Sequence, residues 1–233
     1  MIKIYNYGEV ENSEIFARQN TEENVSRAVS EIIAEVVKNG DKALVSYAEK
    51  FDGANLAALE VTDAEIKEAF GAVDPAFIAV LEEAAVNIRH FHEKQVRSSF
   101  VINDKDGVVM GQKVMPIEKV GIYVPGGTAA YPSTVLMDSI PAKIAGCAEI
   151  VMVTPPLASG KVNPVILAAA KIAGIDRIFK TGGAQAVAAL AYGTESVPKV
   201  DKIVGPGNAY VAAAKRLVYG TIDIDMVAGP SEV

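Results

Sequence analysis

The spacing of apolar residues predicts helices in the first part of the chain. Apolar side chains recur every three or four positions from Val25 to Val37, as on one face of a helix. Gly40 follows this run and is expected to end the helix, and Asp41 is expected to cap the next one. The apolar face of that second helix ends at Phe51. The pattern therefore predicts two consecutive helices joined by a short turn.

Two capping signals and a hairpin signal follow. Thr62 and Glu65 have the spacing of a capping box, and Asp74 before Pro75 predicts the start of a long helix that runs to Phe91. Two short β-branched runs then flank an Asp-Gly turn, which is typical of a β-hairpin. These runs are Phe100–Ile102 and Val108–Met110.

The pattern changes near residue 115, where short apolar runs begin to alternate with glycine-rich turns and helical segments. The expected strands are Val120–Val124, Ile150–Val153, Arg177–Phe179, Lys202–Val204 and a last one at Ile222–Val227. The expected helices are Ser133–Ile144, Pro164–Ile172, Ala184–Ala191 and Ala209–Val218. This alternation predicts an α/β fold in which a parallel, Rossmann-like sheet carries helices on both faces. In the last strand Asp223 and Asp225 share one face, which we interpret as solvated rather than as a catalytic carboxylate pair.

The same change of pattern suggests a division into three segments. Residues 1–18 form an N-terminal segment that is expected to join the sheet domain. Residues 19–118 form a helical region with a β-hairpin, which we interpret as an incomplete domain. Residues 119–233 form the Rossmann-like α/β domain, which ends in a loop that reads as cut in mid-course.

Composition and charge narrow the possible functions. Half of the 233 residues are hydrophobic, yet the apolar runs are short and interrupted, so no membrane span is expected. The net charge of −7, with basic residues scattered along the chain, argues against nucleic-acid binding. The N-terminus lacks the pattern of a secretory signal, and the single cysteine suits a reducing compartment. We therefore expect a cytoplasmic protein.

Three glycine-rich loops, each joining a strand to a helix, are the best candidates for a binding site. They are Pro125–Gly127, Thr181–Gln185 and Gly205–Asn208. Helix N-termini present free N–H groups, and glycine lets an anion approach them closely. A polar or aromatic side chain accompanies each loop: Tyr123 could stack on a ring, and Gln185 and Asn208 could donate to phosphate or ribose oxygens. The alternatives are tight turns, a core tyrosine and helix-capping amides.

The residue types that commonly carry catalysis give no cluster in this chain. His90 and His92 are two positions apart on a predicted helix and point in different directions, so a shared metal is not expected. Nothing near Cys147 in the sequence would lower its pKa, so a small buried cysteine is the preferred interpretation over a nucleophile. The sequence therefore predicts a cofactor cradle but no catalytic base and no metal site in this chain.

The motifs of the chain resemble the histidinol dehydrogenase family over nearly its whole length. The stretches that carry the resemblance are Gly40–Leu44, Phe51–Gly53, Phe91–His92, Val120–Gly127, Tyr131–Met137, Ile140–Ala142, Ala145–Cys147, Gly182–Ala186, Pro198–Asn208, Ile224–Met226 and Ala228–Val233. The resemblance implies oxidation of L-histidinol to L-histidine through an aldehyde, with two NAD molecules used in succession and a zinc ion that holds the substrate. It also implies an intertwined homodimer.

The same resemblance assigns roles to individual residues. Tyr123, Gln185 and Asn208 match cofactor-binding positions, and Ser231 matches a substrate-contacting position. The zinc ligands and the Glu-His base pair of the family follow the motif at residues 229–233, so we expect them beyond Val233. Three interpretations stay open: an N-terminal part of a histidinol dehydrogenase, a non-catalytic fragment that keeps a partial dinucleotide-binding module, and an unrelated α/β enzyme with Cys147 as nucleophile.

Overall fold

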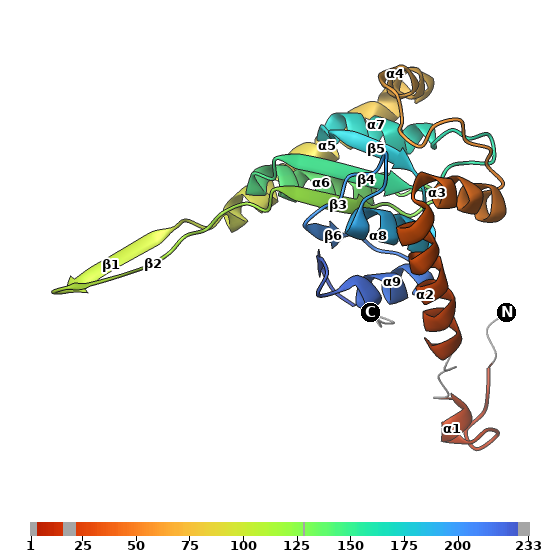
Figure 1. Cartoon of the computed structure of the whole chain (residues 1–233), viewed down its shortest axis with the longest axis horizontal. Helices are drawn as coiled ribbons and strands as arrows, with labels where there is room; N and C mark the ends of the chain where they lie inside the picture. The colour runs from red at the N-terminus through yellow and green to blue at the C-terminus, as the bar shows by residue number, and fades with distance from the viewer. Residues whose placement is uncertain (1–3, 16–21, 128, 228–233) are drawn as a thin grey trace.

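A five-stranded parallel sheet forms the centre of the molecule (Figure 1). The structure is a computed structural model that describes residues 4–15, 22–127 and 129–227. The strands, in spatial order, are β5 (Arg177–Lys180), β4 (Glu149–Thr154), β3 (Lys119–Tyr123), β6 (Lys202–Val204) and β7 (Asp223–Ile224). The chain builds outward from β3 to β5 and then returns to add β6 beside β3. The strand order therefore reverses between β3 and β6, which is where open α/β sheets bind their ligands.

Both faces of this sheet are buried, as parallel sheets require. Along β4, Ile150 and Met152 contribute to the core on one face, and Val151 and Val153 to the core on the other. On the first face lie α6 (Pro132–Ala145) and α7 (Pro164–Ala173), and on the second lie α8 (Gly183–Tyr192) and α9 (Ala209–Val218). The expected α/β fold with helices on both faces is confirmed.

The N-terminal helices form an outer layer on each side (Figure 1). On one side α2 (Glu22–Asn39) crosses α8 and α9 and is followed by α3 (Asp41–Tyr47). On the other side α4 (Asp63–Ala72) packs on α7, and α5 (Pro75–His92) packs on α6 and α7. None of the helices in the described residues is long and apolar enough to cross a membrane. The division at residue 118 stays a prediction, although the helices before it pack closely on the sheet layers.

Three local features differ from the sequence-based expectation. Gly40, at a φ of 53°, is itself the N-cap of α3, and Asp41 is the first helical residue. The Asp41 carboxylate instead accepts hydrogen bonds from Thr194 and Ser196, which tie α3 to the segment after α8. The second helix widens into a π-helical turn, η1 (Ala48–Asp52).

The last strand is also shorter than the expected Ile222–Val227. Asp223 is exposed and pairs with Lys202, as expected for a solvated face. Asp225 lies beyond the end of β7, and it is still exposed while its carboxylate pairs with Lys215 of α9. The expectation of a solvated face therefore holds for the exposure of Asp225, but it missed the ion pair with the buried Lys215.

The predicted hairpin is present and extends far from the rest of the molecule (Figure 1). It consists of β1 (Phe100–Lys105) and β2 (Val108–Gln112), paired antiparallel, and it follows the short η2 (Glu93–Gln95). Every residue of both strands is exposed. The short α1 (Asn12–Ile15) lies near the N-terminus, and the expectation that residues 1–18 join the sheet domain stays a prediction.

Candidate functional site

A pocket of about 700 Å³ lies at the carboxyl edge of the sheet. The loops that follow β3, β4, β5 and β6 all contribute to its lining. In a parallel sheet these loops share one edge, and the order reversal between β3 and β6 opens a crevice there. The glycine-rich loops singled out from the sequence therefore meet at one site.

The glycines of these loops allow unusually close contact between neighbouring strands. A Cβ on Gly126 or Gly182 would lie 2.5 or 2.6 Å from ring atoms of Pro155. A Cβ on Gly205, whose φ is 116°, would lie 2.2 Å from the carbonyl oxygen of Tyr123. Larger residues at these positions would push the loops apart. The glycines thus set the spacing of the pocket walls as well as the shape of the turns.

Tyr123, the last residue of β3, connects two of the loops. Its hydroxyl oxygen accepts a hydrogen bond of 2.9 Å from the backbone N–H of Gly183, the first residue of α8. The side chain is 4% exposed, so its ring face offers little surface for the stacking that the sequence suggested. Burial raises the pKa of Tyr123, while the Gly183 N–H lowers it and the Asp52 carboxylate raises it further. The phenol therefore stays protonated, and its O–H can donate a hydrogen bond to a ligand.

Gln185 and Asn208 line the same pocket from two helix N-termini. Gln185 lies in the first turn of α8 and is 3% exposed. Asn208 is the N-cap of α9, and its Oδ1 accepts hydrogen bonds from the N–H groups of Tyr210 and Val211. The capping interpretation thus holds for Asn208, yet its side-chain NH₂ remains available as a donor. The structure brings Tyr123, Gln185 and Asn208 together in one pocket.

An ion pair between the buried Lys215 and the partly exposed side chain of Asp225 holds the loop that presents Asn208. Lys215 of α9 donates to the carbonyl oxygen of Gly205 at 3.0 Å and pairs with the Asp225 carboxylate. Asp225 in turn accepts the backbone N–H of Gly205 at 2.9 Å. Both backbone polar groups of Gly205 are therefore satisfied by one ion pair. Asp138 of α6 faces this pair, and burial, followed by the charge of Asp225, raises its pKa to about 7.

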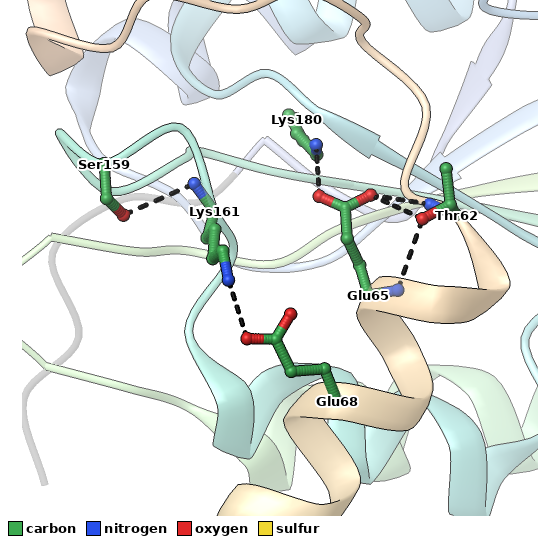
Figure 2. Close-up of polar contacts among 6 residues, drawn as sticks. All are labelled: Thr62, Glu65, Glu68, Ser159, Lys161 and Lys180. Atoms are coloured by element: carbon green, nitrogen blue, oxygen red, sulfur yellow. Dashed lines mark hydrogen bonds and ion pairs between the residues drawn. The ribbon is translucent and has the colours of Figure 1, made fainter.

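Polar contacts also connect helix α4 to the loop after β4 and to the end of β5 (Figure 2), and the first residues of that loop line the pocket. Lys161 in this loop donates to Glu68 of α4 at 2.7 Å. Nearby, Lys180 at the end of β5 donates to Glu65, which also completes the predicted capping box with Thr62. Burial alone would raise the pKa of Glu65, but the hydrogen bonds from Lys180 and Thr62 lower it below its usual value. Helix α4 is thus tied to the sheet at the side of the pocket.

The turn η1 also contributes to this pocket, which the sequence analysis did not predict. Phe51 and Asp52 line it together with Ile32 of α2. Burial raises the pKa of Asp52 to about 6, and its Oδ2 is buried without a hydrogen-bond partner among the described residues. The available signal was the Phe51–Gly53 stretch, which belongs to the family resemblance but carried no assigned role.

The remaining candidates lie elsewhere. The Nδ1–H of His92 donates a hydrogen bond of 2.7 Å to Oε1 of Gln95, and His90 is exposed. Cys147 is half-buried, and burial raises the pKa of its thiol, which disfavours the thiolate that a nucleophile needs. Within residues 4–15, 22–127 and 129–227, no three His, Cys, Asp or Glu residues are grouped as a metal site. Ser231 lies outside the described residues, so its expected substrate contact stays a prediction.

The arrangement is suited to an extended, anionic ligand that also carries hydroxyl groups. The N-termini of α8 and α9 offer partial positive charge at the edge of the pocket. Tyr123, Gln185 and Asn208 supply hydrogen-bond donors, and Pro155 and Leu157 supply apolar surface. Such a mixture of apolar lining and few convergent polar groups is typical of cofactor sites.

Comparisons with known proteins identify the relatives of the chain. The family model described as histidinol dehydrogenase matches residues 16–233. Curated histidinol dehydrogenases from Listeria monocytogenes and Syntrophotalea carbinolica are 56% and 57% identical over 223 and 222 residues, which are 95% and 94% of this chain. The crystal structure of histidinol dehydrogenase from Elizabethkingia anophelis superimposes with a TM-score of 0.88 at 43% identity and covers 92% of this chain. The matches cover 52%, 51% and 50% of those three proteins, so the chain spans about half of their length.

Proposed function

The chain belongs to the histidinol dehydrogenase family, and on that premise we propose that it supplies the NAD-binding part of a zinc- and NAD-dependent enzyme that oxidises L-histidinol to L-histidine through the aldehyde. One observation carries the proposal. Four strand-to-helix loops converge at the point where the strand order reverses, and they place Tyr123, Gln185 and Asn208 in a single pocket.

Each of the three side chains has a role that its geometry supports. The NH₂ groups of Gln185 and Asn208, at the start of α8 and α9, donate to phosphate or ribose oxygens. The Tyr123 hydroxyl accepts the Gly183 N–H and donates a hydrogen bond through its own O–H to the ligand. NAD, when bound, supplies the hydride acceptor for alcohol oxidation. The residues of this chain bind and orient it, and Pro155 and Leu157 exclude water from one side.

The zinc ion of the family finds no matching ligands in the described residues. No group of three His, Cys, Asp or Glu occurs there, so no step is assigned to zinc in this chain. Alcohol oxidation also needs a base for the hydroxyl proton. His90, His92 and Cys147 lie outside the pocket and do not supply one. We therefore propose that this 233-residue chain alone does not oxidise histidinol, and that Ser231 contacts the substrate in the complete site.

The binding proposal is tested by titrating the purified chain with NAD and recording protein NMR shifts. Asn208→Ala removes an N-cap and a pocket donor, so the affinity should fall about tenfold, as expected for the loss of a good hydrogen bond. Asn163→Ala is the matched control, because Asn163 caps the similarly long α7 but does not line the pocket. Equal NAD affinity of both variants and the wild type would overturn the assignment.

The catalytic part of the proposal is tested with histidinol and NAD at millimolar concentration, following NADH absorbance. We expect no turnover by the chain. NADH formation that a zinc chelator abolishes would show that the chain holds a complete site. NAD binding without turnover would instead support the alternative of a non-catalytic dinucleotide-binding fragment. Activity on addition of the part of a relative that this chain does not cover would support the catalytic interpretation.

We also propose that two copies of the chain form a homodimer, in the cytoplasm. The supporting observation is the β1–β2 hairpin, which carries its apolar side chains in an exposed arm (Figure 1). Val101 and Val109 on one face of the hairpin are 71% and 75% exposed. Apolar surface of this kind marks interaction sites. A second copy of this chain is the proposed partner.

A further inference from the structure

Asp52 lines the pocket but has no part in the NAD contacts proposed for Tyr123, Gln185 and Asn208. Its carboxyl group lines the pocket, and its Oδ2 is buried without a hydrogen-bond partner among the described residues. Buried polar groups in proteins are almost always hydrogen-bonded, and an unpaired one destabilises the fold. Asp52 therefore needs a hydrogen-bond donor that the described residues do not provide.

The backbone directs Asp52 to the pocket through an irregular turn. Neighbouring residues on a helix normally point in different directions, yet Phe51 and Asp52 both line the pocket. The chain can do this because the π-helical η1 ends at Asp52, and Gly53 follows in the left-handed region at a φ of 64°. Single π-helical turns within α-helices occur frequently at functional sites.

The charge of Asp52 limits which part of a dinucleotide can lie beside it. Asp52 is the single charged side chain among the described lining residues. A carboxylate repels a diphosphate, so the phosphates belong near the helix N-termini at Gly183 and Asn208. The group beside Asp52 must therefore carry no negative charge, and it must donate hydrogen bonds. Ribose hydroxyls meet both conditions.

The topology indicates which of the two riboses this is. The segment after Asp52 leads to Glu60, which pairs with Phe179 of β5 at one edge of the sheet. Strand β7, the last strand of the described residues, lies at the opposite edge, and Ser231 follows it in the sequence. Under the proposed function the nicotinamide must meet the substrate near Ser231. The adenosine end then lies on the side of β5 and η1, where Phe51 and Ile32 offer apolar surface for a base.

We propose that the Asp52 carboxylate accepts a hydrogen bond from the 2′-hydroxyl of the adenosine ribose, and that it thereby makes the site select NAD over NADP. The inference rests on the proposed function, since it assigns a specificity-determining residue to the same pocket. Rotation about the terminal torsion of Asp52 brings either carboxylate oxygen to the ligand. A phosphate at the 2′ position would meet this carboxylate without a lysine or arginine among the described lining residues to offset its charge.

The proposal predicts coupling between one side chain and one ligand hydroxyl. NAD, 2′-deoxy-NAD and NADP are titrated into the wild-type chain and into Asp52→Ala and Asp52→Asn, with NMR shifts as the readout. Asp52→Ala should weaken NAD binding by about tenfold, the size expected for a hydrogen bond to a charged group. The same substitution should leave 2′-deoxy-NAD binding unchanged, because the two changes remove the same hydrogen bond. In Asp52→Asn the affinity gap between NAD and NADP should narrow by about fivefold or more, since the repulsion is gone.

Two controls separate this role from a structural one. Glu49→Gln removes the same charge from the same turn, but Glu49 is exposed and does not line the pocket, so NAD affinity should not change. Without ligand, Asp52→Asn should unfold at the same temperature as the wild type or a higher one, because it removes an unpaired buried carboxylate.

The outcomes distinguish the inference from the function beneath it. If the wild-type chain binds none of the three nucleotides, the proposed function fails. If it binds NAD but the losses from Asp52→Ala and from 2′-deoxy-NAD simply add, Asp52 does not contact the 2′-hydroxyl, and only the inference is overturned. A drop in unfolding temperature for Asp52→Asn, with the preference for NAD over NADP unchanged, would make Asp52 a structural residue.

Discussion

Strands with similar β-branched sequences have opposite environments in this protein. In the central sheet, β3 and β4 are buried on both faces by helices, whereas every residue of the β1–β2 hairpin is exposed. The local signals are alike, since both regions carry runs of valine and isoleucine. The difference lies in what covers them. Helices of the same chain cover the sheet, whereas the described residues leave the apolar side chains of the hairpin exposed.

The largest difference in the free energy of unfolding is expected when one phenylalanine in each region is replaced by alanine. Phe179 in β5 is 0% exposed, while Phe100 in β1 is 49% exposed. Phe179→Ala should lower the free energy of unfolding by roughly 3–5 kcal/mol, because it leaves a cavity between helices and sheet. Phe100→Ala should cost less than about 1 kcal/mol. Urea denaturation of both variants measures the difference, and equal losses would show that the hairpin is as much a part of the core as the sheet.

Much of the sheet region follows from local sequence signals. The helix expected at Ala209–Val218 has the same bounds in the structure, where Asn208 is its N-cap. The capping box expected from Thr62 and Glu65 is also present. These features depend on residues close together in the chain. The hairpin, too, was found from its Asp-Gly turn. Its complete exposure could not be predicted, because burial depends on elements far away in sequence.

The site was predictable where it depends on strand ends and not where it depends on packing between distant segments. Parallel strands share an edge, so Tyr123, Gln185 and Asn208 were expected to lie together, as they do in the pocket. Asp52 was missed because α2 and η1 reach the pocket only after α2 packs across α8 and α9. The ion pair of Asp225 was not foreseen because its partner, Lys215, comes from helix α9.

The next prediction concerns the ion pair that holds Gly205 at the pocket. Lys215→Met removes the cation and leaves the Gly205 carbonyl without its donor. Removing one partner of a fully buried ion pair costs about 3–5 kcal/mol, and the Asp225 side chain is partly exposed, so a loss of about 3 kcal/mol or less in the free energy of unfolding is expected. NAD affinity should also fall, because the loop that carries Asn208 is no longer fixed. In the exposed hairpin, Lys105→Met should leave both quantities unchanged, and similar behaviour of the two variants would contradict a special role for Lys215.

A smaller effect of opposite sign is expected at Asp138, next to that ion pair. Its pKa is raised to about 7 by burial and by the charge of Asp225. In the unfolded chain Asp138 has its usual pKa of about 4. The wild type therefore loses stability as pH rises from about 4 to 7, and it loses little more above about pH 7. Asp138→Asn should therefore stabilise the protein at pH 8 by roughly 1–3 kcal/mol, and by less at pH 5.

The matched control for Asp138 lies in the hairpin. Asp104→Asn removes the same charge from an exposed position, so its effect on unfolding should be small at both pH values. A stabilisation by Asp138→Asn that does not grow between pH 5 and pH 8 would argue against a buried, protonated carboxyl at this position.

The smallest effect on stability, and the sharpest test of the comparison, belongs to the hairpin itself. Val101 and Val109 lie on one face of it and are almost fully exposed. The double substitution Val101→Thr and Val109→Thr keeps the β-branched shape, so the free energy of unfolding at low protein concentration should change by less than about 0.5 kcal/mol. If a second copy covers this face, the same variant should weaken self-association measured by sedimentation, and the wild type alone should gain stability as protein concentration rises. Val86→Thr on α5 makes a comparable change at another exposed position and should leave association unaltered. Equal association of the wild type and the double variant would mean that the hairpin, unlike the sheet, is not completed by a second copy of this chain through that face.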